Sequence, residues 1–317
     1  YEDDYIEIRN VTNLDFKTFL NHYNNNLDDI IVDFNKIFLN SGIFFNIKSE
    51  AKLNISIIHE TSDNFTIFQN TFINFKKNCE VKLEDNFNLT NNSIININYN
   101  INVEENATIK HNIFQNFANS NKLYLTSNTY CEKNSSYSQN TYNFSDGFVR
   151  NFHHVELNGE FSKASLKGCF FLKDKNICSN KTNIKHNAEN CISDQTYKGI
   201  LTDHSKASYY SNTFVSANAQ KTEGYQLSKG ILLSDNCSFF SKPELRIFAD
   251  DVKCSHGSTI GPVDESALYY LRSRGIDKKI AMKMIISSFI EEDLKNLDYD
   301  TYNKISFNLS DYLKSIV

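Results

Sequence analysis

Polar and apolar residues alternate with period two along short segments of this chain, from about residue 43 to residue 258. Clear examples are residues 80–84, 95–103 and 163–167. Such alternation sends successive side chains to opposite faces of a β-strand. The signals of tight hairpins are scarce, because the sequence holds 10 Gly and 2 Pro and its one Asn-Gly pair is Asn158-Gly159. Many strands without hairpins or intervening helical segments favour a parallel β-solenoid.

In such a solenoid we expect each coil to take roughly 15–25 residues and to stack on the coil before it. A β-sandwich or a jelly roll fits the same alternation, so the pattern alone leaves it as the alternative. Asparagine is abundant, above all before residue 150, and it alternates with Ile, Phe, Leu and Tyr. This arrangement indicates strand edges and turns of a folded solenoid, although an AT-rich coding sequence would give the same bias.

Helix signals replace the alternation after residues 261–262. Asp264 is a favourable N-cap for a first helix, and Gly275 stands where a left-handed residue would end it. Asp277 is expected to cap a second helix that runs to about Leu297, and Thr301 to cap a third. Apolar residues at spacings of three and four predict one wide inward face on the second helix. They are Ile280, Met284, Ile285, Phe289, Ile290 and Leu294.

These patterns divide the chain into three expected parts. Residues 1–40 form the remnant of a partly helical N-terminal region, in which residues 14–20 and 28–39 are candidate helices. Residues 41–262 form the β core, and residues 263–317 form a small C-terminal helical domain. Because the chain begins at Tyr1, we expect a piece of a longer protein, in which a targeting sequence would not be visible.

Charge and cysteine content exclude several classes of function. The net charge is −5, the estimated pI is about 5.9 and the arginines are scattered, whereas a nucleic-acid surface needs clustered Lys and Arg. No apolar run approaches the ~18 residues of a membrane-spanning helix. Seven cysteines without a Cys-x-x-Cys pair fit a reducing compartment better than a disulfide framework or a four-thiolate site within the chain.

The residues with the clearest chemical potential are Cys254 and His256. On a strand, two residues at this spacing share one face, and a thiolate beside an imidazole can ligate iron or zinc. Two donors make only part of a metal site. A buried cysteine packed beside a hydrogen-bonded histidine fits equally well, so the residues alone leave both interpretations open. The sequence contains no P-loop, dinucleotide-binding turn, nucleophile elbow or zinc-protease motif, and the chain does not look like an enzyme by itself.

The segment around this pair resembles the SufB/SufD family of iron–sulfur cluster assembly scaffold proteins, on its SufD side. The resemblance lies in residues 241–261 and 267–276, with further similarity in residues 197–207 and 219–226. SufB-type chains carry an essential cysteine one strand earlier, where this chain has residues 227–230 and no cysteine. The resemblance is therefore to the SufD type.

This resemblance implies a right-handed parallel β-helix followed by a helical domain, and a non-catalytic scaffold role. It implies pairing with a SufB-like paralogue through the last coils and with a SufC-like ATPase through the C-terminal helices. His256 matches the family's histidine and Cys254 the nearby cysteine, so both are expected to contact iron or a transient iron–sulfur cluster whose other ligands come from the SufB-like partner.

The same resemblance, with the asparagine bias, favours the stroma of an apicoplast-type plastid. The sequence leaves open whether a flavin participates and whether the isolated chain pairs with itself. Two alternative functions remain. One is a purely structural partner that stabilises the SufB-like chain. The other is a β-solenoid carbohydrate-active enzyme, which would need a convergent acid or basic cluster that the sequence does not display.

Overall fold

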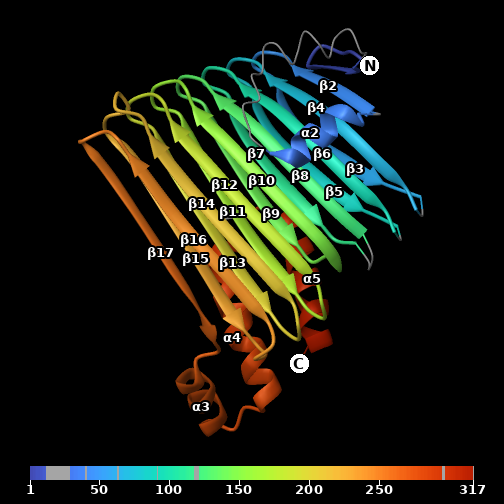
Figure 1. Cartoon of the computed structure of the whole chain (residues 1–317), viewed down its shortest axis with the longest axis vertical. Coiled ribbons are helices and arrows are strands. Elements are labelled where there is room, and N and C mark those ends of the chain that lie inside the picture. Colours follow the sequence, from blue (N-terminus) through green and yellow to red (C-terminus); the bar gives the residue numbers. More distant parts are fainter. Residues whose placement is uncertain are drawn as a thin grey trace.

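The computed structural model describes residues 1–11, 29–39, 41–62, 64–90, 92–117, 121–294 and 297–316. In these ranges a long stack of strands is followed by helices (Figure 1). The elements are β1 (Ile6–Asn10), α2 (Ile30–Ile37), β2 (Ser41–Ile47), β3 (Lys52–Glu60), β4 (Thr66–Phe75), β5 (Glu80–Asn88), β6 (Ile94–Val103), β7 (Thr108–Gln115), β8 (Asn121–Cys131), β9 (Ser136–Asn143), β10 (Gly147–Leu157), β11 (Lys163–Leu172), β12 (Ile177–His186), β13 (Ile192–Leu201), β14 (Lys206–Val215), β15 (Thr222–Leu232), β16 (Ser238–Ile247), β17 (Val252–Pro262), α3 (Glu265–Ser273), α4 (Lys278–Leu294) and α5 (Tyr299–Ile316).

The strands wind into a parallel β-solenoid with two sheets. Sheet A holds the even-numbered strands β2 to β16, with β1 antiparallel at its first edge, and sheet B holds the odd-numbered strands β3 to β17. From β2 to β15, each strand pairs in parallel with the strand one coil later, as β4 pairs with β6 and β6 with β8. The expected mainly β fold, a parallel solenoid followed by helices, is confirmed. This parallel pairing rules out the sandwich and jelly-roll alternatives.

The coils are longer than expected. In the N-terminal coils stacked residues lie 28 positions apart, as Asn70 and Asn98 do, and the expectation of roughly 15–25 residues per coil is wrong. The reason is that every coil holds two strands, such as the 10 residues of β4 and the 9 of β5, together with the turns that join them.

Asparagine has two structural uses in this solenoid. At the turns, Asn78 and Asn106 adopt left-handed backbone angles, with φ of 60° and 59°, which asparagine tolerates better than most residues. On sheet A, Asn98 Nδ2 donates to Asn70 Oδ1 at 2.8 Å and Asn128 Nδ2 donates to Asn98 Oδ1 at 3.3 Å. Such ladders run between coils and satisfy amides that would otherwise be buried without partners.

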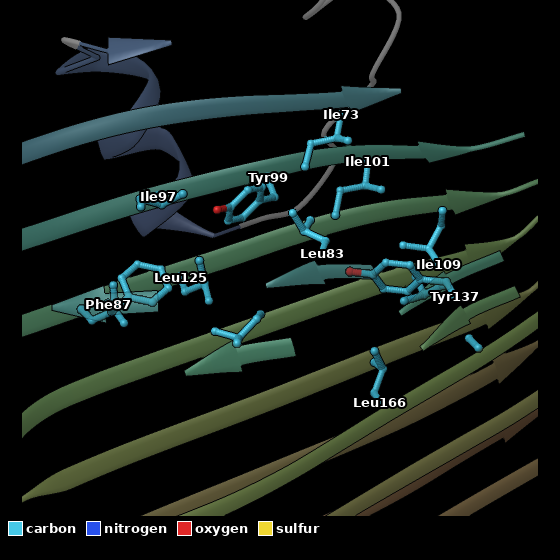
Figure 2. Packing of buried hydrophobic residues seen from close by; sticks show 14 of the residues in the cluster. Ile73, Leu83, Phe87, Ile97, Tyr99, Ile101, Ile109, Leu125, Tyr137 and Leu166 are labelled. Carbon is cyan, nitrogen blue, oxygen red and sulfur yellow. The ribbon is translucent and has the colours of Figure 1, made fainter. Parts of the chain in front are cut away.

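Apolar side chains fill the space between the two sheets. Figure 2 shows part of this cluster, with Leu83 and Ile109 from sheet B and Ile97, Ile101 and Leu125 from sheet A. All five are almost fully buried. Each such side chain contributes roughly 1.5–3 kcal/mol relative to an exposed one, so the interior stabilises the solenoid along its length.

The helices α4 and α5 cover the outer face of sheet B, on the far side of the strands in Figure 1. Phe171 and Ile200 from the sheet pack with Ile290 of α4 and Leu309 of α5 in a second apolar cluster. The hydroxyl of Tyr312 donates to the Leu172 carbonyl at 3.0 Å. The second half of the helical region is therefore fixed to the solenoid, whereas α3 contacts mainly α4.

Three of the four predicted helix-terminus residues are confirmed and one is wrong. Asp264 caps α3, Gly275 follows it with φ of 82°, and Asp277 accepts from Lys279 N before α4. The third cap is wrong: α5 is capped by Asp298, whose carboxylate accepts from both the backbone N and the hydroxyl of Thr301. Asp298 sits one residue before Tyr299, where a short acceptor meets the free N–H groups of the first turn.

The predicted inward face of α4 is only partly buried. Ile290 and Leu294 are buried, but Ile280 is 56% exposed and Met284 is 47% exposed. The buried face instead includes Ala281 and Ile286. Periodicity alone could not separate these faces, because apolar residues stand on both.

At the N-terminal end, α2 packs on β4 and β6 of sheet A. The candidate helix at residues 14–20 lies outside the described residues. No helix among the described residues is both long enough and apolar enough to span a bilayer.

Candidate functional site

Cys254 and His256 lie on β17, the last strand of the solenoid. β17 pairs with β15 on one side only, and it ends sheet B as β16 ends sheet A (Figure 1). Within the part of the chain that the structure describes, the other edge of β17 has no strand partner. The two candidate ligands therefore stand at an open end of the stack.

The thiol of Cys254 faces inward and is half buried. It packs against the small cluster of Val215, Ala219 and Ala249. Its strand partner is Gly224, and a Cβ at that position would come within 3.3 Å of the Cys254 sulfur, so the glycine leaves room for the thiol. Burial raises the pKa of Cys254, against a smaller opposing effect of a hydrogen bond with the Gly224 backbone. The free thiol therefore stays protonated at neutral pH, and a metal ion would have to displace the proton.

His256 occupies the next position on the same face, beside Gln226 of β15. Unlike Cys254 it is exposed. It forms no hydrogen bond or ion pair with any residue that the structure describes. An exposed imidazole without a protein partner keeps both ring nitrogens available for a ligand.

This pair alone would be an incomplete metal site. Among the described residues, no group of three or more His, Cys, Asp or Glu side chains is placed to hold a metal ion. A thiol and an imidazole on one strand face fit iron or a cluster as two donors, and further ligands would have to come from elsewhere. The neighbouring acid Glu223 is used differently, since it pairs with Lys253 at 3.1 Å on the opposite face.

Sequence reasoning missed a buried charged network at the other end of the solenoid. The carboxylate of Asp85 accepts from His59 Nε2 at 2.9 Å, from His111 Nε2 at 2.7 Å and from the Tyr99 hydroxyl at 2.9 Å. His111 Nδ1 also meets the Tyr137 hydroxyl at 3.0 Å. Figure 2 shows Tyr99 and Tyr137 among the apolar side chains of the interior.

Burial alone would raise the pKa of Asp85, but the hydrogen bonds from His111 and His59 outweigh it and hold that pKa below its ordinary range. The signal for this network was present in the sequence. Asp85 falls in the apolar phase of its strand, after Val81 and Leu83 and before Phe87. A polar residue in that phase must point into the solenoid.

Comparison with known proteins supports a family assignment. The family model for the SUF system FeS cluster assembly, SufBD core domain, matches residues 57–289. The iron–sulfur cluster assembly protein SufD of Escherichia coli is 37% identical over 138 residues, which are 44% of this chain and 33% of that protein. The chloroplastic protein ABCI7 of Arabidopsis thaliana is 41% identical over 99 residues, which are 31% of this chain and 21% of that protein.

Iron–sulfur cluster assembly protein SufD of Plasmodium falciparum is 28% identical over 159 residues, which are 48% of this chain and 11% of that protein. The matched part is thus a third or less of the length of each of these relatives. The family model, however, matches most of the chain and includes both Cys254 and His256. The chain therefore belongs to the SufB/SufD family of proteins of SUF-type iron–sulfur cluster assembly, and its similarity is to the SufD members of that family.

Proposed function

We propose that this chain is a non-catalytic scaffold subunit of a SUF-type assembly complex, paired with a SufB-like chain and a SufC-like ATPase. In this proposal Cys254 and His256 contribute ligands to iron or to a nascent cluster, which is the cargo of the complex. The observation that carries it is their position together on an edge strand at the open end of the solenoid. There a second chain can supply the missing ligands.

The last coil also offers a surface for the SufB-like partner. The edges of β16 and β17 expose backbone groups that pair readily with another strand. On the outer face of sheet A, Phe240 is 56% exposed beside Tyr210, at 5.6 Å between ring centroids. Phe248 is exposed beside Phe214 in the same way. In the absence of the partner, the same edge would pair with a second copy of this chain.

The ligand role predicts that His256→Ala removes most of the bound cargo. The complex of all three chains would be reconstituted without oxygen using Fe(II) and sulfide, and iron and acid-labile sulfide would be measured after desalting. We expect both to fall to a small fraction of the content of the unaltered complex, because the exposed imidazole is the more accessible donor. Cys254→Ala is expected to have a milder effect, since its half-buried thiol also fills space.

His204→Ala is the matched control, because His204 is an exposed histidine in a turn away from β17. Its iron and sulfide content should equal that of the unaltered complex. Unchanged content in the His256 variant would end the ligand role and leave the purely structural partner as the better function.

The helices α3 and α4 provide a candidate surface for the SufC-like ATPase. Tyr269 of α3 is 76% exposed and Met284 of α4 is 47% exposed, and Tyr270 and Ile280 are exposed with them. Exposed aromatic and apolar side chains on adjoining helices are typical of a docking surface. α5 and the inner face of α4 already pack against the solenoid, so they are not available to a partner.

The docking role predicts that Tyr269→Ala combined with Met284→Ala weakens ATPase binding by about 2 kcal/mol or more, roughly 30-fold in Kd. Calorimetric titration of the SufC-like chain would measure it. Phe307→Ala on α5 is the control, since Phe307 is 68% exposed on a different helix. Equal affinities for both variants would contradict the assignment. Point variants are preferable to deleting the helices, because deletion would uncover Phe171 and Ile200 on sheet B.

For localisation we propose the stroma of an apicoplast-type plastid. The support is indirect: one relative is named chloroplastic and others come from Plasmodium species. Import of the complete protein fused to a fluorescent reporter, followed by microscopy against a plastid marker, would test it.

A further inference from the structure

Gln226 has a buried oxygen atom that no described residue satisfies. The residue lies inside the last coils, on β15, and is 3% exposed. Its Nε2 donates to the Thr213 hydroxyl at 2.8 Å and to the Glu244 carbonyl at 3.1 Å. Because a backbone carbonyl can only accept, this contact fixes which end of the amide is nitrogen. Its Oε1 has no hydrogen-bond partner among the described residues.

Of the two residues that stand beside Gln226 on the neighbouring strands, His256 is the one whose donors are unused. Gln226 stands between Gln195 of β13 and His256 of β17 on one face of sheet B. The amide nitrogen of Gln195 is directed to Thr213 Oγ1 at 2.8 Å and to the Asn212 carbonyl at 3.5 Å. The imidazole of His256, in contrast, has no described partner. On β13, therefore, the amide donor of the neighbouring Gln195 is already used. On β17, the ring donor of the neighbouring His256 is not.

We propose that Gln226 is a positioning residue for His256: the exposed imidazole turns so that its Nδ1–H donates a hydrogen bond to Gln226 Oε1, and Nε2 is then left to bind the metal. Nδ1 is the ring nitrogen nearer the strand, whereas Nε2 extends further from it. Histidines that bind metals almost always donate their other ring N–H to an oxygen acceptor, which fixes the tautomer and the ring orientation. This inference rests on the proposed ligand role of His256 and deepens it.

The tautomer of His256 in the metal-free chain tests the hydrogen bond directly. Nitrogen-15 NMR of the imidazoles, with the His256 signals assigned through His256→Ala, distinguishes Nδ1–H from Nε2–H. We expect Nδ1–H in the unaltered chain and in Gln226→Glu, which keeps an acceptor, and loss of that tautomer in Gln226→Met. Gln195→Met is the matched control, because it removes the neighbouring amide from the same Thr213 hydroxyl. It should leave the His256 tautomer unchanged.

An Nε2–H tautomer in the unaltered chain would overturn the inference, and this measurement needs only the His256→Ala variant, for assignment. The second readout is the affinity of the three-chain complex for Fe(II) without oxygen. Gln226→Met should weaken it about 10- to 100-fold and Gln226→Glu should restore it. Full Fe(II) affinity in Gln226→Met, when His256→Ala has lost it, would also overturn the positioning role. Full affinity in His256→Ala would instead overturn the proposed ligand function, while the tautomer still decides the hydrogen bond.

Discussion

Replacing Asp85 with alanine is expected to lower the free energy of unfolding by about 3–5 kcal/mol, the usual cost of removing one partner from a buried charged network. The carboxylate accepts hydrogen bonds from two histidines and from the Tyr99 hydroxyl, and it is completely buried. Without it, His111 and Tyr99 would keep polar groups inside the solenoid with no acceptor. Leaving such groups unsatisfied costs more than the hydrogen bonds themselves contribute.

Urea unfolding at pH 7, followed by circular dichroism, would measure this loss. Asp85→Asn should be the milder variant, because an amide of the same shape can still accept from one histidine and donate to the other. Glu104→Ala is the control, since Glu104 pairs with Lys76 at 2.8 Å in a partly exposed turn. Such an ion pair contributes roughly 0–1 kcal/mol. A loss in Asp85→Ala no larger than in this control would show that the network does not stabilise the fold.

The strands could be predicted from the sequence because each strand shows its two faces locally, and the scarcity of hairpin signals favoured parallel stacking. The length of a coil could not, since it depends on which strand pairs with which across 28 residues. Parallel pairing is a long-range property that period-two alternation does not contain. The same limit applied to α4, where periodicity could not say which apolar residues the solenoid covers. Ile290 is covered and Ile280 is not.

The candidate site was predictable only as a pair of residues. Cys254 and His256 share a strand face because of their spacing, and the structure places that strand at the open end of the solenoid. Neither the spacing nor the described part of the fold shows the further ligands that the proposed site needs. The buried polar residues of the interior could have been predicted from the alternation. Asp85 and His111 both occupy apolar-phase positions, His111 between Ile109 and Ile113. Attention to exceptions within the alternation would have found them.

Stability is expected to fall as the pH is lowered from about 6.5 to 4.5, because two further histidines are buried in the neutral state. Burial lowers the pKa of His153 to about 3, with a smaller effect of nearby His111, and burial lowers the pKa of His186 to about 4. Each has one ring nitrogen bonded to a serine hydroxyl, Ser127 for His153 and Ser193 for His186, and the other without a described partner.

In this window the unfolded chain takes up protons at both histidines, whereas the folded chain does not. Lower pH therefore favours unfolding, by about 1.4 kcal/mol per pH unit for each histidine and about 5 kcal/mol in all. Denaturation midpoints measured across this range would give the slope. Asp85 adds little to it, because its pKa is already held below the ordinary value and its carboxylate stays ionised in both states.

The double variant His153→Gln with His186→Gln should flatten the pH dependence, even though it also lowers stability at pH 7. Glutamine can keep a hydrogen bond to the serine but cannot take up the proton. His204→Gln is the control, because His204 is exposed in a turn and should leave the slope unchanged. A slope that survives in the double variant would mean that other groups govern the acid lability. Because the comparison rests on the slope and not on the midpoint, the packing loss of the double variant does not obscure it.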